Sequence, residues 1–276
     1  MEINSVQNFT LPKTNSRKNV SFNGLRRLLN ADTVDAFLKK VEVVGDVVIQ
    51  KRVEEKGRLE LVPTAVTLVK VQKPFTKERG NSRTFYSLFE RGFRKAKSVK
   101  DLDSKELGLM ELEYANLENM HVSSDVTPEV KSFIAAKKAY KEALEIDYLV
   151  SYEGDKYRGI GTRLLDIAID VSNKLGFGGR TFLYSLNKIP ADYMKDSVYC
   201  WRMQSANPTK FYFDYGFRAD GATNRWIKDG YTDIKSINMY LPQKTINQKL
   251  SARKEHPLFV EWPKKPAADV KNDVKE

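Results

Sequence analysis

The stretch that most constrains the fold is residues 155–167, Asp-Lys-Tyr-Arg-Gly-Ile-Gly-Thr-Arg-Leu-Leu-Asp-Ile. It joins an alternating, strand-like segment at residues 145–153 to an amphipathic segment at residues 162–175. Two glycines separated by one residue therefore stand at the expected start of a helix, and basic residues precede them. Free backbone N–H groups at a helix N-terminus favour an anion, and glycine lets that anion approach the backbone. The stretch predicts a strand–loop–helix unit that binds a phosphate group.

The other segments predict a mixed α/β domain around this unit. In residues 162–175 the apolar side chains recur at helical spacing, and Gly176 follows as the expected C-terminal cap. Alternation, turn residues and caps predict strands at 41–53, 59–71, 107–117, 180–186 and 236–242, and helices at 82–100, 127–144 and 207–217. This succession of strands and helices is that of a mixed α/β architecture.

Charge and cysteine content narrow the classes of function. The chain has 47 Lys and Arg against 36 Asp and Glu, and this net charge of +11 favours acidic partners. The single cysteine, Cys200, allows no disulfide framework and indicates a cytoplasmic protein. The two histidines, His121 and His256, lie far apart, which argues against a His/Cys zinc site, and we expect no metal. No apolar run reaches the ~18–20 residues of a membrane span, so no membrane partner is expected.

The chain divides into one domain with two extensions. Residues 1–24 are polar without apolar periodicity and are expected to form a flexible arm. Residues 25–241 are expected to form the single domain. From residue 242 to 276 the composition resembles the arm again, except for the apolar segment 257–262, Pro-Leu-Phe-Val-Glu-Trp. We expect this segment to dock on the domain, and binding to a partner is the alternative.

Residues 79–100 combine basic and aromatic side chains. They contain seven Lys and Arg with one acid, Glu90. A basic segment interleaved with aromatics is one mark of a nucleic-acid-binding surface. Helical spacing of the aromatics instead predicts a helix with an apolar face in the core and a basic face in water. We favour the core-facing helix and keep nucleic-acid contact as an alternative.

Three kinds of phosphate loop compete for residues 155–167. A Walker A loop requires Gly-x-x-x-x-Gly-Lys-Ser/Thr, and no lysine stands beside a hydroxyl residue at the required place. A dinucleotide loop requires a third glycine, where this chain has Leu164. It also requires an acidic residue at the end of the following strand, and the strand expected at 180–186 does not end in one. Both motifs therefore fail.

The third kind matches. The loop resembles the acetyl-CoA loop of the GNAT superfamily of N-acetyltransferases, Gln/Arg-x-x-Gly-x-Gly/Ala between a strand and a long helix. Lys156, Gly159 and Gly161 occupy its three defining positions, and Lys156 departs from the usual Gln or Arg. A second family segment follows at residues 207–217, where Asn207 and Tyr212 match in order, with slightly shorter spacing. The resemblance covers about residues 140–241.

The resemblance implies a fold and a co-substrate. It implies a mostly antiparallel central sheet flanked by helices, and transfer of the acetyl group from acetyl-CoA directly to an amine acceptor in a ternary complex. By match to the family's positions, the residues expected to hold acetyl-CoA are Leu149, Val150, Ser151, Lys156, Arg158, Gly159, Gly161, Thr162 and Asn207. The Leu149 N–H is the expected donor to the thioester oxygen.

The resemblance also implies two catalytic residues. Glu145 lies eleven residues before Lys156, the spacing of the catalytic glutamate in some members, and it is the expected base. The alternative is that Glu145 ends the preceding helix or faces solvent. Tyr212 matches the tyrosine that protonates the departing thiolate, and a core aromatic is its alternative role. For Asn207 the alternative is a helix N-cap.

Two other functions remain open at this stage. The chain could bind acyl-CoA on a GNAT-like fold without catalysis, or it could be a basic nucleic-acid- or ribosome-associated factor that uses residues 79–100. The acceptor amine is not identified by the sequence.

Overall fold

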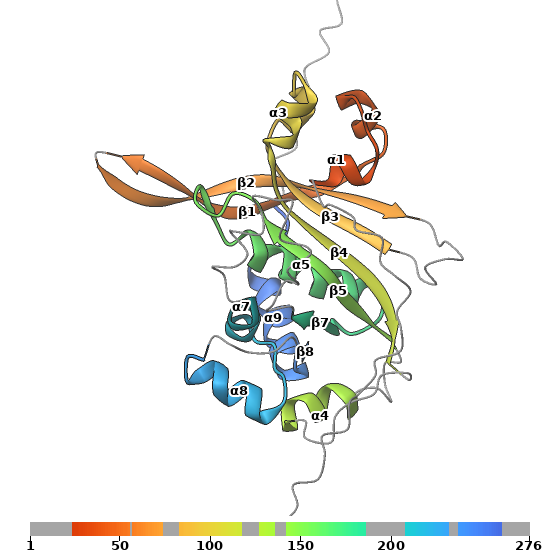
Figure 1. The fold of residues 1–276 in the computed structure, drawn as a ribbon, viewed down its shortest axis with the longest axis vertical. Helices are drawn as coiled ribbons and strands as arrows, with labels where there is room; N and C mark the ends of the chain where they lie inside the picture. Colours follow the sequence, from red (N-terminus) through yellow and green to blue (C-terminus); the bar gives the residue numbers. More distant parts are fainter. Residues whose placement is uncertain are drawn as a thin grey trace, which may run out of the picture.

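A computed structural model of the chain describes residues 24–55, 57–73, 83–117, 127–135, 142–185, 208–231 and 237–260. An eight-stranded sheet forms its centre, with strand order β6-β1-β2-β3-β4-β5-β7-β8 (Figure 1). The strands are β1 (Glu42–Glu55), β2 (Arg58–Lys73), β3 (Arg83–Glu90), β4 (Glu106–Asn116), β5 (Glu142–Ser151), β6 (Tyr157–Arg158), β7 (Thr181–Ser185) and β8 (Ile237–Tyr240). Among these strands every neighbouring pair is antiparallel except β5 and β7, which are parallel.

Helices lie on both faces of the sheet. They are α1 (Gly24–Leu28), α2 (Val34–Leu38), the 3-10 turn η1 (Phe93–Lys95), α3 (Val99–Asp103), α4 (Pro128–Ala135), α5 (Ile160–Lys174), α7 (Pro208–Tyr215), α8 (Gly221–Lys228) and α9 (Gln243–Glu255). The expected fold class, a mixed and mostly antiparallel sheet flanked by helices, is confirmed.

The helix after the Gly-x-Gly loop, α5, covers one face of β4 and β5. Its buried residues, Ile160, Leu164, Leu165, Ile167, Ala168 and Ile169, form the main core with apolar side chains of the sheet. The expected amphipathic helix is therefore confirmed. Gly176 follows with φ +86°, a left-handed conformation that glycine adopts without steric cost, so the expected cap is confirmed as well.

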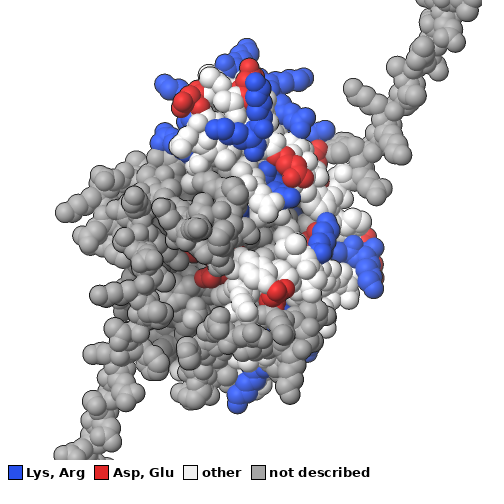
Figure 2. Space-filling model, turned by 90° about the vertical axis from the view of Figure 1, so that its right-hand side faces the viewer, with Lys and Arg blue, Asp and Glu red and all other residues white. Residues whose placement is uncertain are grey.

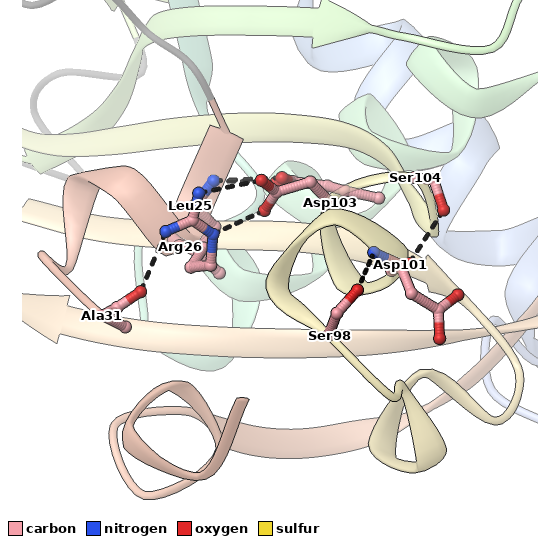
Figure 3. Close-up of polar contacts among 8 residues, drawn as sticks. Leu25, Arg26, Ala31, Ser98, Asp101, Asp103 and Ser104 are labelled. Atoms are coloured by element: carbon pink, nitrogen blue, oxygen red, sulfur yellow. Dashed lines mark hydrogen bonds and ion pairs between the residues drawn. The ribbon is translucent and has the colours of Figure 1, made fainter. Parts of the chain in front are cut away.

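The opposite face carries two smaller clusters. One lies under α1, α2 and α3 and includes Leu25, Phe37, Phe89 and Leu102. A guanidinium joins α1 to α3: Arg26 donates to both carboxylate oxygens of Asp103, at 2.7 and 2.9 Å (Figure 3). The other cluster lies under α4.

The hairpin expected from residues 41–71 is confirmed. β1 and β2 pair from Glu42↔Lys70 to Glu55↔Arg58 with one register shift, and the ribbon projects beyond the rest of the sheet (Figure 1). The strands expected at 107–117, 180–186 and 236–242 are present as β4, β7 and β8.

The helix expected over residues 82–100 is wrong. Residues 83–90 form β3, whose two neighbours are β2 and β4. Leu88 belongs to the core under α5, whereas Phe85 and Phe89 belong to the cluster under α1–α3. A strand that is covered on both faces reads as a continuous apolar run, and such a run also fits helical spacing.

Of the basic residues of this segment, Arg83 lies in β3, and the others that the structure describes lie beyond the strand, on the turn, η1 and α3. The exposed ones are Arg91, Arg94, Lys95, Lys97 and Lys100. Lys and Arg side chains gather at the upper end of the molecule, where Figure 1 places α1, α2 and α3 (Figure 2). Apart from Arg83, the described basic charge is therefore in water, as expected, but it is not on the face of a long helix.

Two further expectations need correction. The helix expected over 127–144 is wrong for its last residues, because 142–144 belong to β5. Its start is confirmed: Thr127 Oγ1 accepts from Val130 N at 3.4 Å, and Pro128 begins α4. The expected loose tail is wrong for residues 243–255, which form α9, with Ile246 fully buried. Most of the expected N-terminal arm, residues 1–23, lies outside the described residues.

The expected docking of the last apolar segment is confirmed for its described part. Phe259 forms a bridge with Val47 of β1, and Val260 N donates to Asp46 O at 2.9 Å. The segment therefore pairs with the outer edge of β1.

The buried carboxyl of Glu106 accepts hydrogen bonds from the first turn of α1. Leu25 N donates to both of its oxygens at 3.1 Å, and Ser87 Oγ donates to Oε1 at 2.7 Å. Burial nevertheless raises the pKa of Glu106 from 4.5 to about 7, although these hydrogen bonds act in the opposite direction. A carboxyl whose pKa is raised on folding stabilises the native state below its unfolded pKa, and this stabilisation is lost as the pH rises through the folded pKa.

We therefore expect the free energy of unfolding of wild type, relative to Glu106→Gln, to fall between pH 4.5 and 7, by at most about 3 kcal/mol. Urea unfolding at several pH values measures it. The control Glu60→Gln makes the same chemical change at an exposed position of β2. A wild type–Glu106→Gln difference that stays constant with pH would contradict the prediction.

Candidate functional site

The site begins at an irregularity in β5. Glu111 of β4 pairs with Tyr148, but the next residue, Leu112, pairs with Ile146. Asp147 is therefore the extra residue of a β-bulge in β5. Bulges redirect a strand and shift the alternation of its backbone groups by one residue.

β5 and β7 separate at this bulge. Their parallel register ends at Ile146↔Leu183, although β5 continues to Ser151 beside β4. β7 continues to Ser185 beside β8. Each strand thus follows its other neighbour, and an opening in the sheet begins after Ile146.

The ladder determines which backbone groups face this opening. Tyr152 N donates to Leu107 O at 2.9 Å, so Val150 is the next residue of β5 whose backbone groups bond to β4. Hydrogen-bonded residues alternate along an antiparallel strand, so the N–H and C=O groups of Leu149 and Ser151 point away from β4, toward the opening. Of the three expected strand residues, Leu149 and Ser151 can pair with an inserted ligand, while the backbone of Val150 is used by β4.

The N-terminus of α5 lies just beyond β5. Gly159 has φ +83° and precedes the first helical residue, and Arg163 N makes the first intrahelical bond, to Gly159 O at 2.8 Å. The N–H groups of residues 160–162 therefore precede the first donor within the helix. Such N–H groups, together with the helix dipole, favour an anion. The expected phosphate loop has the backbone geometry that this role requires.

A glycine of β4 allows α5 to lie this close to the sheet. A Cβ at Gly108 would lie 2.6 Å from Ile160 Cγ2 and 2.7 Å from Val150 O. Ile160 is the first residue of α5, and Val150 belongs to β5. Gly108 therefore allows the turn at Gly159 to lie beside the open part of β5.

Helix α7 connects the two sides of the opening. Thr209 in its first turn lies 2.7 Å, oxygen to oxygen, from Ser185 at the end of β7. A Cβ at Gly161 would lie 3.0 Å from Phe211 Cζ, so α7 also contacts the first turn of α5. A side chain at Gly161 would crowd Phe211, whereas at Gly159 glycine is favoured because φ is positive.

Tyr212 lies on the same helix, with its ring centroid 5.3 Å from Phe211 and 6.0 Å from Phe217. Burial raises the pKa of its hydroxyl. The hydroxyl is therefore a proton donor at neutral pH. No hydrogen bond joins it to another residue in the described ranges.

The polar residues of the loop at 156–162 differ in their contacts: Lys156 is paired with an acid, whereas Arg158 and Thr162 are exposed. Lys156 Nζ lies 2.5 Å from Glu90 Oε1, and Tyr157 Oη donates to the same oxygen at 2.7 Å. Lys156 is thus directed toward β3, although its side chain is 45% exposed. Arg158 and Thr162 are exposed at the mouth of α5.

Glu145 lies inside β5, directly opposite Glu113 of β4. It therefore does not end the preceding helix, which removes one alternative for this residue. Asn207 lies outside the described residues.

Three features of the site escaped sequence analysis: Gly108, the bulge at Asp147, and the buried acid Glu111. Gly108 could have been noticed in the strand expected at 107–117, because a glycine within a strand can mark the close approach of another segment. The bulge and the burial of Glu111 depend on register between distant strands.

Within the described part of the chain, no group of three or more His, Cys, Asp and Glu side chains is arranged to hold a metal ion. No helix there is both long and apolar enough to span a membrane.

Comparisons with known proteins gave fold-level likenesses only. No family model matches the chain, and no curated protein matches it. Among solved structures, AtaTR bound with AcCoA aligns with a TM-score of 0.33 and 15% identity, over 61% of this chain and 74% of that one. The KacTA–DNA complex aligns with a TM-score of 0.32 and 13% identity, over 62% and 74%. A bacterial toxin aligns with a TM-score of 0.31 and 14% identity, over 63% and 73%. These TM-scores lie below 0.5, so the function is argued from the residues of this chain.

The close approach at Gly108 gives a prediction. We expect Gly108→Ala to lower the free energy of unfolding by about 1–3 kcal/mol, because the methyl group overlaps both a side chain and a backbone oxygen. Amide exchange in the first turn of α5 should become faster. Denaturant unfolding and hydrogen exchange measure these effects.

The matched control is Gly154→Ala, where an added Cβ meets nothing within 4 Å. Equal destabilisation by the two substitutions would show that contact with β4 does not position α5.

Proposed function

We propose that the chain is an N-acetyltransferase that moves the acetyl group of acetyl-CoA directly to an amine. The observation that carries the proposal is the opening between β5 and β7, where backbone groups of Leu149 and Ser151 face the gap beside the N-terminus of α5. A ligand with an amide-containing arm and a pyrophosphate matches both features.

Three parts of acetyl-CoA have an expected partner in this proposal. The N–H groups at the start of α5 hold the pyrophosphate, and the exposed Arg158 and Thr162 add polar contacts. The pantetheine amides pair with Leu149 and Ser151 as an added strand would. The Leu149 N–H donates to the thioester oxygen and stabilises the negative charge that develops there.

The chemical step forms one bond and breaks one. The amine nitrogen attacks the thioester carbon, the new C–N bond forms, and the C–S bond breaks. Glu145 takes the proton that the amine loses. Tyr212 gives a proton to the departing thiolate, a role that suits a hydroxyl whose pKa is raised by burial.

A binding measurement tests the co-substrate. We expect titration calorimetry to show that the wild type binds acetyl-CoA and CoA, and that Gly159→Glu weakens both by at least about tenfold, or ~1.4 kcal/mol. The added carboxylate would lie where the pyrophosphate is held.

Gly230→Glu is a matched control. Gly230 has φ +81°, close to the +83° of Gly159, and an added Cβ meets nothing within 4 Å at either position. The control separates backbone strain from repulsion at the phosphate site. Wild-type protein that binds neither acetyl-CoA nor CoA would overturn the proposed function.

A kinetic measurement tests the catalytic roles. Tyr212→Phe and Glu145→Gln should each lower kcat by about 10²-fold or more, because general acid–base catalysis contributes ~10²–10⁴-fold. Acetyl-CoA affinity should change little. A free-thiol assay on a panel of amines gives the rates, and calorimetry gives the affinities.

Tyr231→Phe, at an exposed tyrosine, is the control. Rates equal to wild type in both site variants would exclude these residues as acid and base. Acetyl-CoA binding without transfer to any amine would instead support a non-catalytic acyl-CoA-binding module.

A further inference from the structure

The loop before α5 is attached to the sheet through its backbone. Within this loop, β6 pairs with residues 50–51 of β1. Arg52 N also donates to Lys156 O at 2.9 Å. The chain therefore runs as an added strand of the sheet as far as Arg158, and the turn into α5 begins at Gly159, where φ is +83°.

One carboxylate from β3 contacts two side chains of this loop. Glu90, the last residue of β3, accepts at Oε1 from Lys156 Nζ at 2.5 Å and from Tyr157 Oη at 2.7 Å. Since the strand order is β6-β1-β2-β3, these contacts span β1 and β2. Lys156 Nζ also lies 5.2 Å from the centre of the Tyr157 ring, within the range of a cation–π contact. Glu90, Lys156 and Tyr157 therefore form one compact group, the loop brace.

The loop brace is fixed at both ends. Glu90 pairs with Val66 of β2, and its N–H donates to Lys105 O at 2.8 Å. Alternate residues of a strand share a face, so Glu90 lies on the face of Leu88, which belongs to the core under α5. Tyr157 belongs to the same core and is 4% exposed. A buried ring thus connects β6 to β3 on the α5 face of the sheet.

The loop brace also compensates the charge of Lys156. Burial raises the pKa of Glu90, but hydrogen bonds from Lys156 and Tyr157 lower it, and the resulting pKa lies below its ordinary value. The carboxylate is thus ionised at neutral pH, at 2.5 Å from the ammonium group of Lys156. A hydrogen bond between ionised groups is about twice as strong as one between neutral groups. Lys156 is therefore bound within the protein before any phosphate approaches.

The turn that follows the loop brace is fixed on its other side by the core. Gly159 is preceded by the buried Tyr157 and followed by Ile160, which is 2% exposed. Ile160 packs closely against Gly108 of β4. This arrangement orders the N–H groups at the start of α5 before a ligand binds, which lowers the free-energy cost of ordering the chain on binding.

We infer that Glu90 is a positioning residue for the proposed acetyl-CoA loop, and that Lys156 acts through Glu90 and not on the pyrophosphate. Without this carboxylate, Lys156 and the Tyr157 hydroxyl lose their common acceptor, and the strand before Gly159 is held by backbone pairing with β1. The exposed Arg158 is then the cation that the loop offers to a phosphate. The inference rests on the proposed function, and it adds the residue that fixes the loop.

Two acyl donors test the positioning role. They are acetyl-CoA and S-acetylpantetheine, which has the same thioester and amide arm but no pyrophosphate. Glu90→Ala removes two hydrogen bonds, so calorimetry should show acetyl-CoA binding about three- to tenfold more weakly than in wild type. The affinity for S-acetylpantetheine should stay within about twofold, because only the binding of the pyrophosphate is affected. Amide exchange at residues 159–162 of the ligand-free protein should become faster.

A double-mutant cycle tests the role of Lys156. Lys156→Met and Glu90→Ala should each weaken acetyl-CoA binding, and the double variant should bind about as weakly as the weaker single variant, because both substitutions remove the same interaction. If Lys156 instead held the pyrophosphate, Lys156→Met would weaken binding by the same factor in the Glu90→Ala background. That result would overturn the inference for Lys156.

Two further variants complete the set. Tyr157→Phe removes one donor and keeps the buried ring, so it serves if Glu90→Ala does not fold. It should weaken acetyl-CoA binding by about two- to threefold. Glu60→Ala, on the exposed part of β2, makes the same substitution as Glu90→Ala away from the loop and should leave the affinity unchanged.

The outcomes separate the two proposals. If the wild type binds acetyl-CoA and both Glu90→Ala and Tyr157→Phe keep its affinity, the positioning role is overturned and the proposed function still stands. An equal loss of affinity for acetyl-CoA and S-acetylpantetheine would also overturn the role, because it would indicate general damage to the fold. Wild-type protein that binds no acetyl-CoA would overturn the proposed function, and the positioning role with it.

Discussion

The arrangement of the molecule depends on the extra residue in β5. A strand can stay in register with two neighbours only while the alternation of its backbone groups suits both. Before Asp147, the Leu144 N–H bonds toward β7, to Arg180 O. After the bulge, even-numbered residues bond to β4 instead, so the odd-numbered Leu149 and Ser151 face the other side. Because β7 has by then turned to follow β8, no strand of the described residues pairs with these groups.

The helices preserve this opening because they hold its edges from outside the sheet. Close approach at Gly108 fixes the start of α5, and α7 contacts both α5 and the end of β7. The carboxylate of Asp166 connects α5 to α7, because it accepts a hydrogen bond from the Tyr215 hydroxyl at 2.7 Å. Two cations of α9 lie close to the same group, Arg253 at 3.5 Å and Lys249 at 3.9 Å. The polar segment after residue 242 is therefore part of the structure behind the site.

Sequence analysis succeeded where the determining interactions are local. A left-handed glycine, a helical stripe and a capping glycine are sufficient to predict the turn at Gly159 and the helix that follows. The β1–β2 hairpin is local in the same sense. The segment that forms β3 was wrongly predicted to be helical. Both faces of this strand are apolar because helices cover the sheet above and below it, and the sequence alone does not show that covering. The bulge at Asp147 could not be predicted, since it depends on register with β4. The burial of Glu111 could not be predicted either, because Arg83, which donates to its Oε1, comes from a third strand.

The charge of the chain has a physical consequence for the proposed co-substrate. Polyanions are favoured by the net charge of +11 and by the N-terminus of α5. At physiological ionic strength the Debye length is about 8 Å, so exposed charges farther away than this interact weakly with a bound anion. The net charge therefore helps an anion to approach, whereas its retention has to depend on short-range contacts. The N–H groups of residues 160–162 and the exposed Arg158 are the groups that the chain offers for such contacts beside the opening.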